Sequence, residues 1–188
     1  YPAPDKIASL TDASGVRLPV TSRPLIVVQP HTNKRFVTVG TGRLLHSSDI
    51  ASSQAQRFFA IIDGSGVRFN KSADLPTGIS FPITTAKLKQ LTDLTQKVTL
   101  DLSSEIGWYV DLGQVAGGPG WRVISDATSS FLGVVVFTAM VPCTDSAGEP
   151  SGTILRGRLG ARELLFMARH GKGHKHLPHE VNYRANVF

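Results

Sequence analysis

Short apolar runs separated by turn residues recur along the whole chain. In the first third, Leu25–Val28 is a β-branched run, residues 35–39 alternate polar and apolar side chains, and residues 57–62 form a third apolar run. Each run has the length of a strand, and segments containing Gly, Pro or Asp separate them. The pattern therefore predicts three antiparallel strands, the third closed by a turn at residues 63–66.

In the middle of the chain, the spacing of the apolar residues changes. Leu88, Leu91 and Leu94 lie three apart within residues 84–95, which predicts one short helix, and residues 97–102 alternate as a strand would. Two further strands are predicted at 107–112 and 121–125, on either side of a Gly/Pro turn.

The last apolar runs predict a buried strand followed by a hairpin. Residues 134–139 are apolar on both faces, which is typical of an internal strand covered on both sides. Residues 143–151 are predicted as a loop. A hairpin should follow, with strands at 153–159 and 163–167 around Gly160-Ala161.

A loose internal repeat organises these runs. The segments that begin at Val20, Arg35 and Arg57 recur in the same order, roughly a hundred positions further on, at Val123, Val134 and Thr153. Neither set of strands could bury both its faces alone, and radial stacking of such sets is how propeller blades are covered. Chance similarity between β-rich segments is the alternative explanation.

Composition agrees with an all-β domain. The 188 residues are 41% hydrophobic, enough for a sizeable core, and 18 glycines and 11 prolines fall between the apolar runs. The net charge of +6 would suit an anionic partner only if the basic residues clustered. The one dense basic stretch is 156–175. The other basic residues are scattered singly, and we expect a solvated surface without nucleic-acid binding at Arg17, Arg23, Arg35, Arg43, Arg57, Arg68, Lys87 and Arg122.

Cysteine count and apolar run length constrain the chain further. Cys143 is the only cysteine, so any disulfide partner would have to lie elsewhere. No apolar run has the length of a membrane span. The sequence begins at Tyr1 without a Met or a signal-like segment, which indicates a fragment or processed product with any targeting signal upstream.

Two groups of segments resemble the PilC/PilY family of type IV pilus proteins. The first comprises Thr21-Ser22-Arg23-Pro24, residues 39–45, Ser48-Asp49-Ile50 and residues 54–63. The second comprises residues 107–112, 121–126 and 134–142, a strand followed by a Pro and a Cys-bearing loop. These elements follow the family's order from about Thr11 to Leu165.

The resemblance implies a fold, a role and a location. The fold would be the later blades of a seven-bladed, quinoprotein-like β-propeller at 1–167. The residues of 168–188 themselves, rather than the resemblance, predict a basic, His-rich and flexible tail. The role would be pilus assembly, twitching motility and adhesion at the pilus tip, with pilin and minor pilin subunits and a host-cell or surface receptor as partners. The location would be the periplasm, outer membrane and cell surface.

The chain departs from that family at two places. Asp63-Gly64-Ser65-Gly66 and Asp145-Ser146-Ala147-Gly148 each supply one carboxylate, too few for the family's calcium loop. Any calcium is therefore expected in upstream blades, and this chain is assigned no cofactor. The tail from Ala168 to Phe188 also leaves the family pattern.

Several residues could in principle take part in catalysis or bind a metal, but none is assigned as a catalytic, cofactor-binding or metal site. His170, His174, His176 and His179 have spacings that could let two or three of them bind a zinc or nickel ion, but a flexible basic tail is the favoured interpretation. Cys143 with His31 or His46 lacks a local signature of nucleophilic catalysis. The other candidates considered are the carboxylate pairs Asp101 with Glu105 and Asp111 with Asp126, the segment Gly40-Thr41-Gly42, and the two tryptophans Trp108 and Trp121, expected to pack between blades.

We therefore expect a non-enzymatic pilus assembly and adhesion module that acts through loops on a rigid scaffold. Two alternatives stay open: a quinoprotein-like or hydrolytic propeller enzyme, and a purely structural interaction domain without a receptor.

Overall fold

The computed structural model describes residues 6–30, 32–65, 67–69, 74–92, 99–116, 118–129, 135–144, 150–159, 164–170 and 183–185. Most of the strands in these ranges belong to two large β-sheets, and helix there is confined to a few short turns. The chain is therefore all-β, as predicted.

The first sheet is built around the long strand β4. Its strands run in the order β2-β3-β4-β8-β7, and β5 pairs with the end of β4. All neighbours are antiparallel except the parallel pair β7 and β8. The predicted strands at 25–28, 35–39 and 57–62 are confirmed, with bounds β2 (Leu25–Val28), β3 (Lys34–Gly40), β4 (Arg57–Ser65), β5 (Val67–Arg68), β7 (Lys89–Leu91) and β8 (Gly107–Asp111).

The second sheet is antiparallel throughout and follows chain order. It comprises β9 (Thr128–Ser129), β10 (Val135–Thr144), β11 (Pro150–Leu159), β12 (Leu164–His170) and β13 (Tyr183–Ala185). The predicted hairpin is confirmed, because Leu159 of β11 pairs with Leu164 of β12. The repeat segments that begin at Arg35 and Arg57 thus form β3 and β4 of the first sheet, and β10 and β11 of the second sheet contain residues of their later copies. The segments that begin at Val20 and Val123 belong to no named strand.

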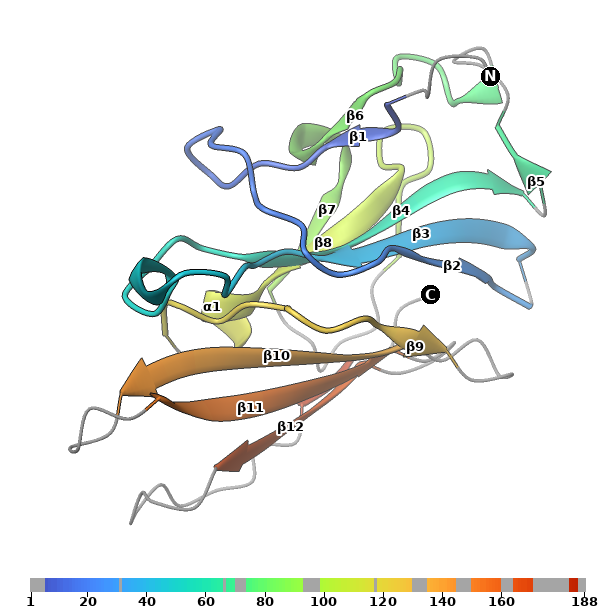
Figure 1. The fold of residues 1–188 in the computed structure, drawn as a ribbon. Coiled ribbons are helices and arrows are strands. Elements are labelled where there is room, and N and C mark those ends of the chain that lie inside the picture. The colour runs from blue at the N-terminus through green and yellow to red at the C-terminus, as the bar shows by residue number, and fades with distance from the viewer. Residues whose placement is uncertain are drawn as a thin grey trace.

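One core joins the two sheets face to face (Figure 1). Phe58 of β4 and Phe137 of β10 are each at most 1% exposed, and their rings stack with centroids 3.9 Å apart. Trp108 and Trp121 are buried in the same cluster. Burial of these large rings supplies much of the apolar area that holds the sheets together.

A second core covers the opposite face of the first sheet. Phe59 and Ile61 of β4 point to this side, because successive residues of a strand face opposite sides. The cover is the short parallel pair of β1 (Ala8–Ser9) and β6 (Ile83–Thr84) with their flanking segments (Figure 1). β4 is consequently buried on both faces, which explains why its sequence is apolar at successive positions.

The predicted helix at 84–95 is wrong for the residues that the structure describes there. The segment contains the 3₁₀ turn η3 (Thr85–Lys87) and then β7, and Leu88 and Leu91 are buried in the cores on the two faces of the sheet. Leucines spaced three apart fit a turn followed by a strand as well as a helix, and the apolar pattern alone does not distinguish these two structures.

Other boundaries also differ from the predictions. Residues 121–125 form a single bridge, Arg122 with Met140, in place of a strand, and residues 99–102 are not a strand. The helix α1 (Leu112–Ala116) begins where the strand at 107–112 was predicted to end. The predicted loop at 143–151 is shorter, since β10 ends at Thr144 and β11 begins at Pro150.

Two further predictions concerned the strand at 134–139, expected to be covered on both faces, and the turn at 63–66. Along β10, Val135, Phe137 and Ala139 are buried while Val136 and Thr138 are half-buried, so one face is covered more completely than the other. Asp63, placed in a turn by the sequence, lies inside β4 and is ion-paired with Arg35, their Oδ1 and Nε atoms 3.0 Å apart. β12 and β13 reach into 168–188, and the division of the chain at residue 167 stays a prediction.

Candidate functional site

The connection between β3 and β4 is an ordered loop organised by one buried carboxylate. It contains the 3₁₀ turn η1 (Ser47–Asp49). Asp49 is 3% exposed and accepts hydrogen bonds from the backbone N–H of Leu45 at 3.0 Å and of His46 at 3.1 Å. Its other oxygen accepts from Nε of Arg43 at 2.8 Å. A short acidic side chain therefore fixes the backbone that precedes it, as capping carboxylates do.

Arg122 holds the same loop from the other half of the chain. Its guanidinium, 3% exposed as a residue, donates to the carbonyl oxygens of Asp49, of Ser52 at 2.8 Å and of Arg43 at 3.2 Å. Nε donates to the Gly120 carbonyl at 2.9 Å. The planar fork of Arg satisfies several carbonyls at once, which a lysine cannot do. The region from Arg43 to Ser52, clamped by Arg122, is called the clamped loop below.

The charged groups of the clamped loop and Arg122 favour one another's ionised forms. The N–H of Leu45 and then the guanidinium of Arg43 lower the pKa of Asp49 from 3.8 to about 2. Burial lowers the pKa of Arg122, and the charge of Asp49 opposes that effect. Asp49 is therefore ionised at neutral pH and both of its oxygens act as acceptors.

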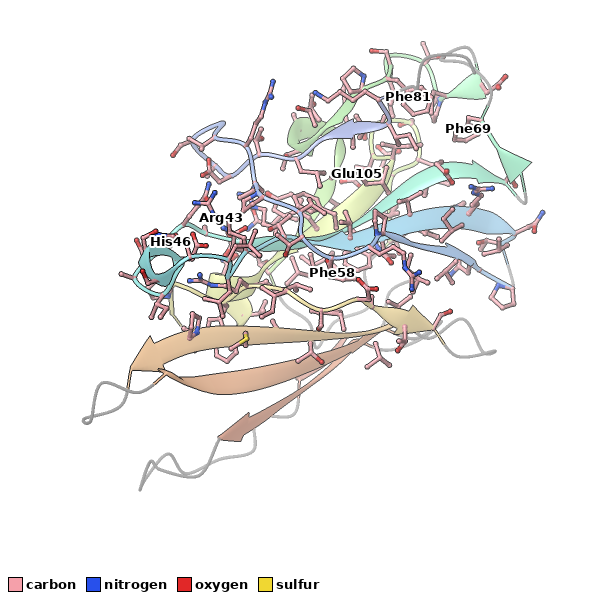
Figure 2. The ribbon with its side chains drawn as sticks, viewed as in Figure 1. Arg43, His46, Phe58, Phe69, Phe81 and Glu105 are labelled. Carbon is pink, nitrogen blue, oxygen red and sulfur yellow. The ribbon has the colours of Figure 1, made fainter. Side chains whose placement is uncertain are left out.

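Three side chains of the clamped loop are exposed. Leu45 is 80% exposed, the side chain of Arg43 is 58% exposed, and His46 is also exposed. Figure 2 shows Arg43 and His46 together beside η1, at one end of the molecule. An apolar and a cationic side chain are thus exposed on a backbone that buried hydrogen bonds hold in place.

A second buried arginine ties the N-terminal segment to the sheet. Nη1 of Arg57 donates to the Thr11 carbonyl at 2.6 Å, and its guanidinium lies 4.6 Å from the centre of the Tyr109 ring. Asp111 Oδ2 is 3.7 Å from its Nε. Arg57 is 4% exposed and these contacts keep its charge compensated, so its role is structural.

The carboxylate pairs weighed from the sequence have structural contacts. Glu105 Oε2 accepts from the N–H of Asp101 at 2.8 Å, while Asp101 accepts from Ser103. Asp111 and Asp126 belong to different ion pairs, with Arg57 and Arg23 respectively. Neither pair shows a carboxylate placed against another for acid and base chemistry.

The remaining candidates fall on strands, cores or residues outside the description. Cys143 lies in β10 rather than in a loop, and His31 is not described. His46 accepts from the N–H of Ser48 through Nδ1 at 3.2 Å. Trp108 and Trp121 pack between the sheets, as expected. His174, His176 and His179 lie outside the described residues, as does the turn at 145–148.

The described residues contain neither a candidate metal cluster nor a candidate membrane-spanning helix. No group of three or more His, Cys, Asp or Glu in that part of the chain could hold a metal ion. No helix there is long and apolar enough to cross a membrane.

Sequence reasoning missed the two arginines that organise this structure. It placed Arg57 and Arg122 among scattered, solvated cations, but both are buried. The available signal was their setting, since each stands among large apolar residues in a run predicted as a strand. A charged residue inside such a run is buried only when it is paired or hydrogen-bonded, and those partners come from distant segments.

Comparison with curated proteins finds short matches to enzymes. The chain is 51% identical over 41 residues to the S-methyl-5′-thioadenosine phosphorylase of Hyperthermus butylicus, which covers 22% of this chain and 15% of the relative. It is 48% identical over 48 residues to the probable S-methyl-5′-thioinosine phosphorylase of Pseudomonas syringae pv. tomato, covering 26% and 20%. The chain thus spans only about a fifth or less of these relatives. No family model matches the chain.

These matches overturn the expectation that the chain has no enzymatic character. That expectation rested on the lack of a recognisable catalytic motif, and it did not take into account the segment that the chain shares with phosphorylases. The likeness is local, about 22% of the chain, and it does not by itself assign a site residue.

Comparison with solved structures extends much further along the chain. The C-terminal domain of Pseudomonas aeruginosa PilY1 is similar with a TM-score of 0.57 and 20% identity, over 82% of this chain and 34% of that one. The chain spans about a third of the length of that solved domain. At this identity the likeness concerns architecture alone. The two-sheet arrangement described above is therefore a PilY1-like fold.

Proposed function

We propose that this chain is part of a type IV pilus assembly and tip adhesion protein that acts by surface recognition and supports twitching and attachment. The observation that carries the proposal is the PilY1-like fold over 82% of the chain. The quoted pilus-family segments from Thr11 to Leu165 support it independently of the fold, because they come from sequence. Pilin subunits and a surface receptor would be its partners, and the outer membrane and pilus tip its location.

We infer that the two sheets are neighbouring blades of a larger propeller. Their face-to-face packing through Phe58 and Phe137, and the likeness to only 34% of the PilY1 chain, support this interpretation. A structure of the full-length protein would test it, the expected result being seven blades and the contradicting result an isolated two-sheet domain. A calcium site, if the protein has one, is expected in the upstream blades, where a calcium titration of the full-length protein would find it.

The pilus role is tested in the bacterium that encodes the chain. Deleting the gene should reduce twitching zones and surface piliation, and complementation with the full-length gene should restore both. Antibodies against the protein should label pilus tips in electron micrographs. Normal piliation and twitching in the deletion strain would contradict the proposed role.

The phosphorylase matches favour a second candidate function. The matched segment is 41 to 48 residues long, and we propose that it includes the C-terminal end and overlaps the last residues of the pilus-like pattern, which ends near Leu165. The purified chain should be incubated with S-methyl-5′-thioadenosine and inorganic phosphate, with a version ending at residue 167 as the control. Consumption of the nucleoside by the full chain alone would support this candidate, and equal background rates would contradict it.

A further inference from the structure

The register of the second sheet separates its residues onto two different faces. Directly paired residues of neighbouring antiparallel strands share a face, and successive residues of one strand alternate between the faces. Phe137 pairs with Gly157, which pairs in turn with Phe166, and Phe137 lies in the core between the two sheets. This row of residues therefore marks the core-facing side, and the opposite side is called the outer face below.

Four arginines lie on the outer face. Arg158 of β11 pairs with Leu165 of β12, which pairs in turn with Arg184 of β13. Arg156 is two residues before Arg158 and therefore shares its face, and Arg169 is four residues after Leu165 and shares it too. No Asp or Glu occupies an outer-face position anywhere in β9 to β13. The net charge of +6 thus has a cluster in the fold, which an anionic partner requires.

The position and charge of the outer face set it apart from a surface that another sheet would cover. Figure 1 shows the first sheet and the β1–β6 pair on the core-facing side of the second sheet, so no described element lies over the outer face. A further blade with an apolar face would have to bury four guanidinium groups there. Burial of charge without paired acids is costly, so the outer face fits an anionic partner better than it fits another apolar sheet.

The residues between the arginines indicate which anionic partner fits. No outer-face position in β9 to β13 holds an aromatic residue, which single-stranded nucleic acid would need for base stacking. Aliphatic residues occupy the positions around the arginines, namely Val136, Met140, Ile154, Leu165 and Met167. Binding to a lipid surface combines attraction between basic residues and anionic headgroups with burial of apolar groups at the interface. The outer face contains both kinds of residue.

We propose that the outer face of the second sheet binds the surface of an anionic lipid membrane. The arginines contact headgroup phosphates, for which the planar guanidinium is well suited, and the aliphatic residues between them meet the boundary of the acyl chains. The inference goes beyond the pilus role and does not depend on it, because it follows from the register of β10 to β13 and from the residues on one face.

The test measures binding of the purified full-length protein to vesicles of phosphatidylcholine alone and of phosphatidylcholine mixed with phosphatidylglycerol. We expect binding only to the mixed vesicles, and weaker binding as the salt concentration rises. The double variant Arg156→Gln, Arg158→Gln should bind at least about tenfold more weakly. The matched control is Lys6→Gln, Arg17→Gln, which removes the same charge at two exposed positions outside the second sheet.

Melting temperatures show whether each variant keeps the fold, and the pair Arg169→Gln, Arg184→Gln on the neighbouring strands replaces the first pair if that pair does not fold. Failure of the wild type to bind the mixed vesicles would overturn the proposal. Equal weakening by the outer-face pair and by the control pair would do the same, as would tighter binding to duplex DNA at the same phosphate concentration. A deletion strain with normal piliation would contradict the pilus role and leave the vesicle result unaffected.

Discussion

Phe58 of β4 and Phe137 of β10 stack face to face, with ring centroids 3.9 Å apart and planes inclined by 10°. The two residues are 79 positions apart and belong to different sheets. Their contact lies in the middle of the core that Trp108 and Trp121 complete. The stack thus links the two sheets within one hydrophobic core.

Phe58→Ala should lower the free energy of unfolding by about 3–5 kcal/mol, because it removes a fully buried ring and leaves a cavity between the sheets. Chemical denaturation followed by circular dichroism measures the change. Val16→Ala, at an exposed position, should cost less than about 0.5 kcal/mol. A similar small cost for Phe58→Ala would mean that the sheets do not depend on this contact.

Arg122→Met should destabilise the protein by at least about 2 kcal/mol, since it leaves the carbonyls of Asp49 and Ser52 without their donor in a buried setting. Arg23→Met is the control. Arg23 forms a solvent-exposed ion pair with Asp126, 3.5 Å long, whose loss should cost no more than about 1 kcal/mol. Equal effects of the two substitutions on the denaturation midpoint would contradict the clamp.

The contribution of Asp49 to stability should disappear in acid. Its pKa falls from 3.8 to about 2 in the folded protein, so its stabilising effect is complete above pH 3.8 and is lost as the pH falls through about 2. Asp49→Asn should therefore be less stable than the wild type at neutral pH, and the difference should shrink toward pH 2. The lowered pKa of Asp101 is present in both proteins and cancels in the comparison.

A series of denaturation curves from neutral pH to about pH 2 measures this difference. A gap between the wild type and Asp49→Asn that stays constant over the whole range would show that the ionised carboxylate is not its source.

Gly107→Ala should destabilise the protein more than Gly78→Ala does. Both glycines have positive φ, +142° and +80°, which is costly for alanine. At Gly107 an added Cβ would also lie 2.2 Å from the carbonyl oxygen of Ala60, while at Gly78 it would meet nothing within 4 Å. Thermal melts of the two variants isolate the close approach of β8 to β4, and equal melting temperatures would argue against it.

The sequence predicted the elements better than their boundaries. The strands at 25–28, 35–39 and 57–62 and the last hairpin are confirmed because strong β-branched and aromatic runs with turn residues between them allow few other structures. The leucines at 84–95 led to a wrong helix prediction. Leu88 and Leu91 are buried in cores on opposite faces of the sheet, and such burial requires apolar residues but no helix.

The candidate site was not predictable in the same way. Ser48 and Asp49 were noted only for their likeness to pilus proteins, and Arg43 and Arg122 were placed among solvated cations. Arg122 holds the loop through hydrogen bonds to residues 70 or more positions away, such as Ser52. Such contacts leave no periodic pattern in the sequence.

The sequence by itself determined the β class and most of the strands, because alternation, β-branching and turn chemistry are local properties that each segment carries alone. Only the tertiary structure decided which strands became neighbours, that Arg57 and Arg122 are buried, and that Leu45 is held in water. Those outcomes follow from the packing of two sheets around Phe58 and Phe137, which is a property of the whole chain.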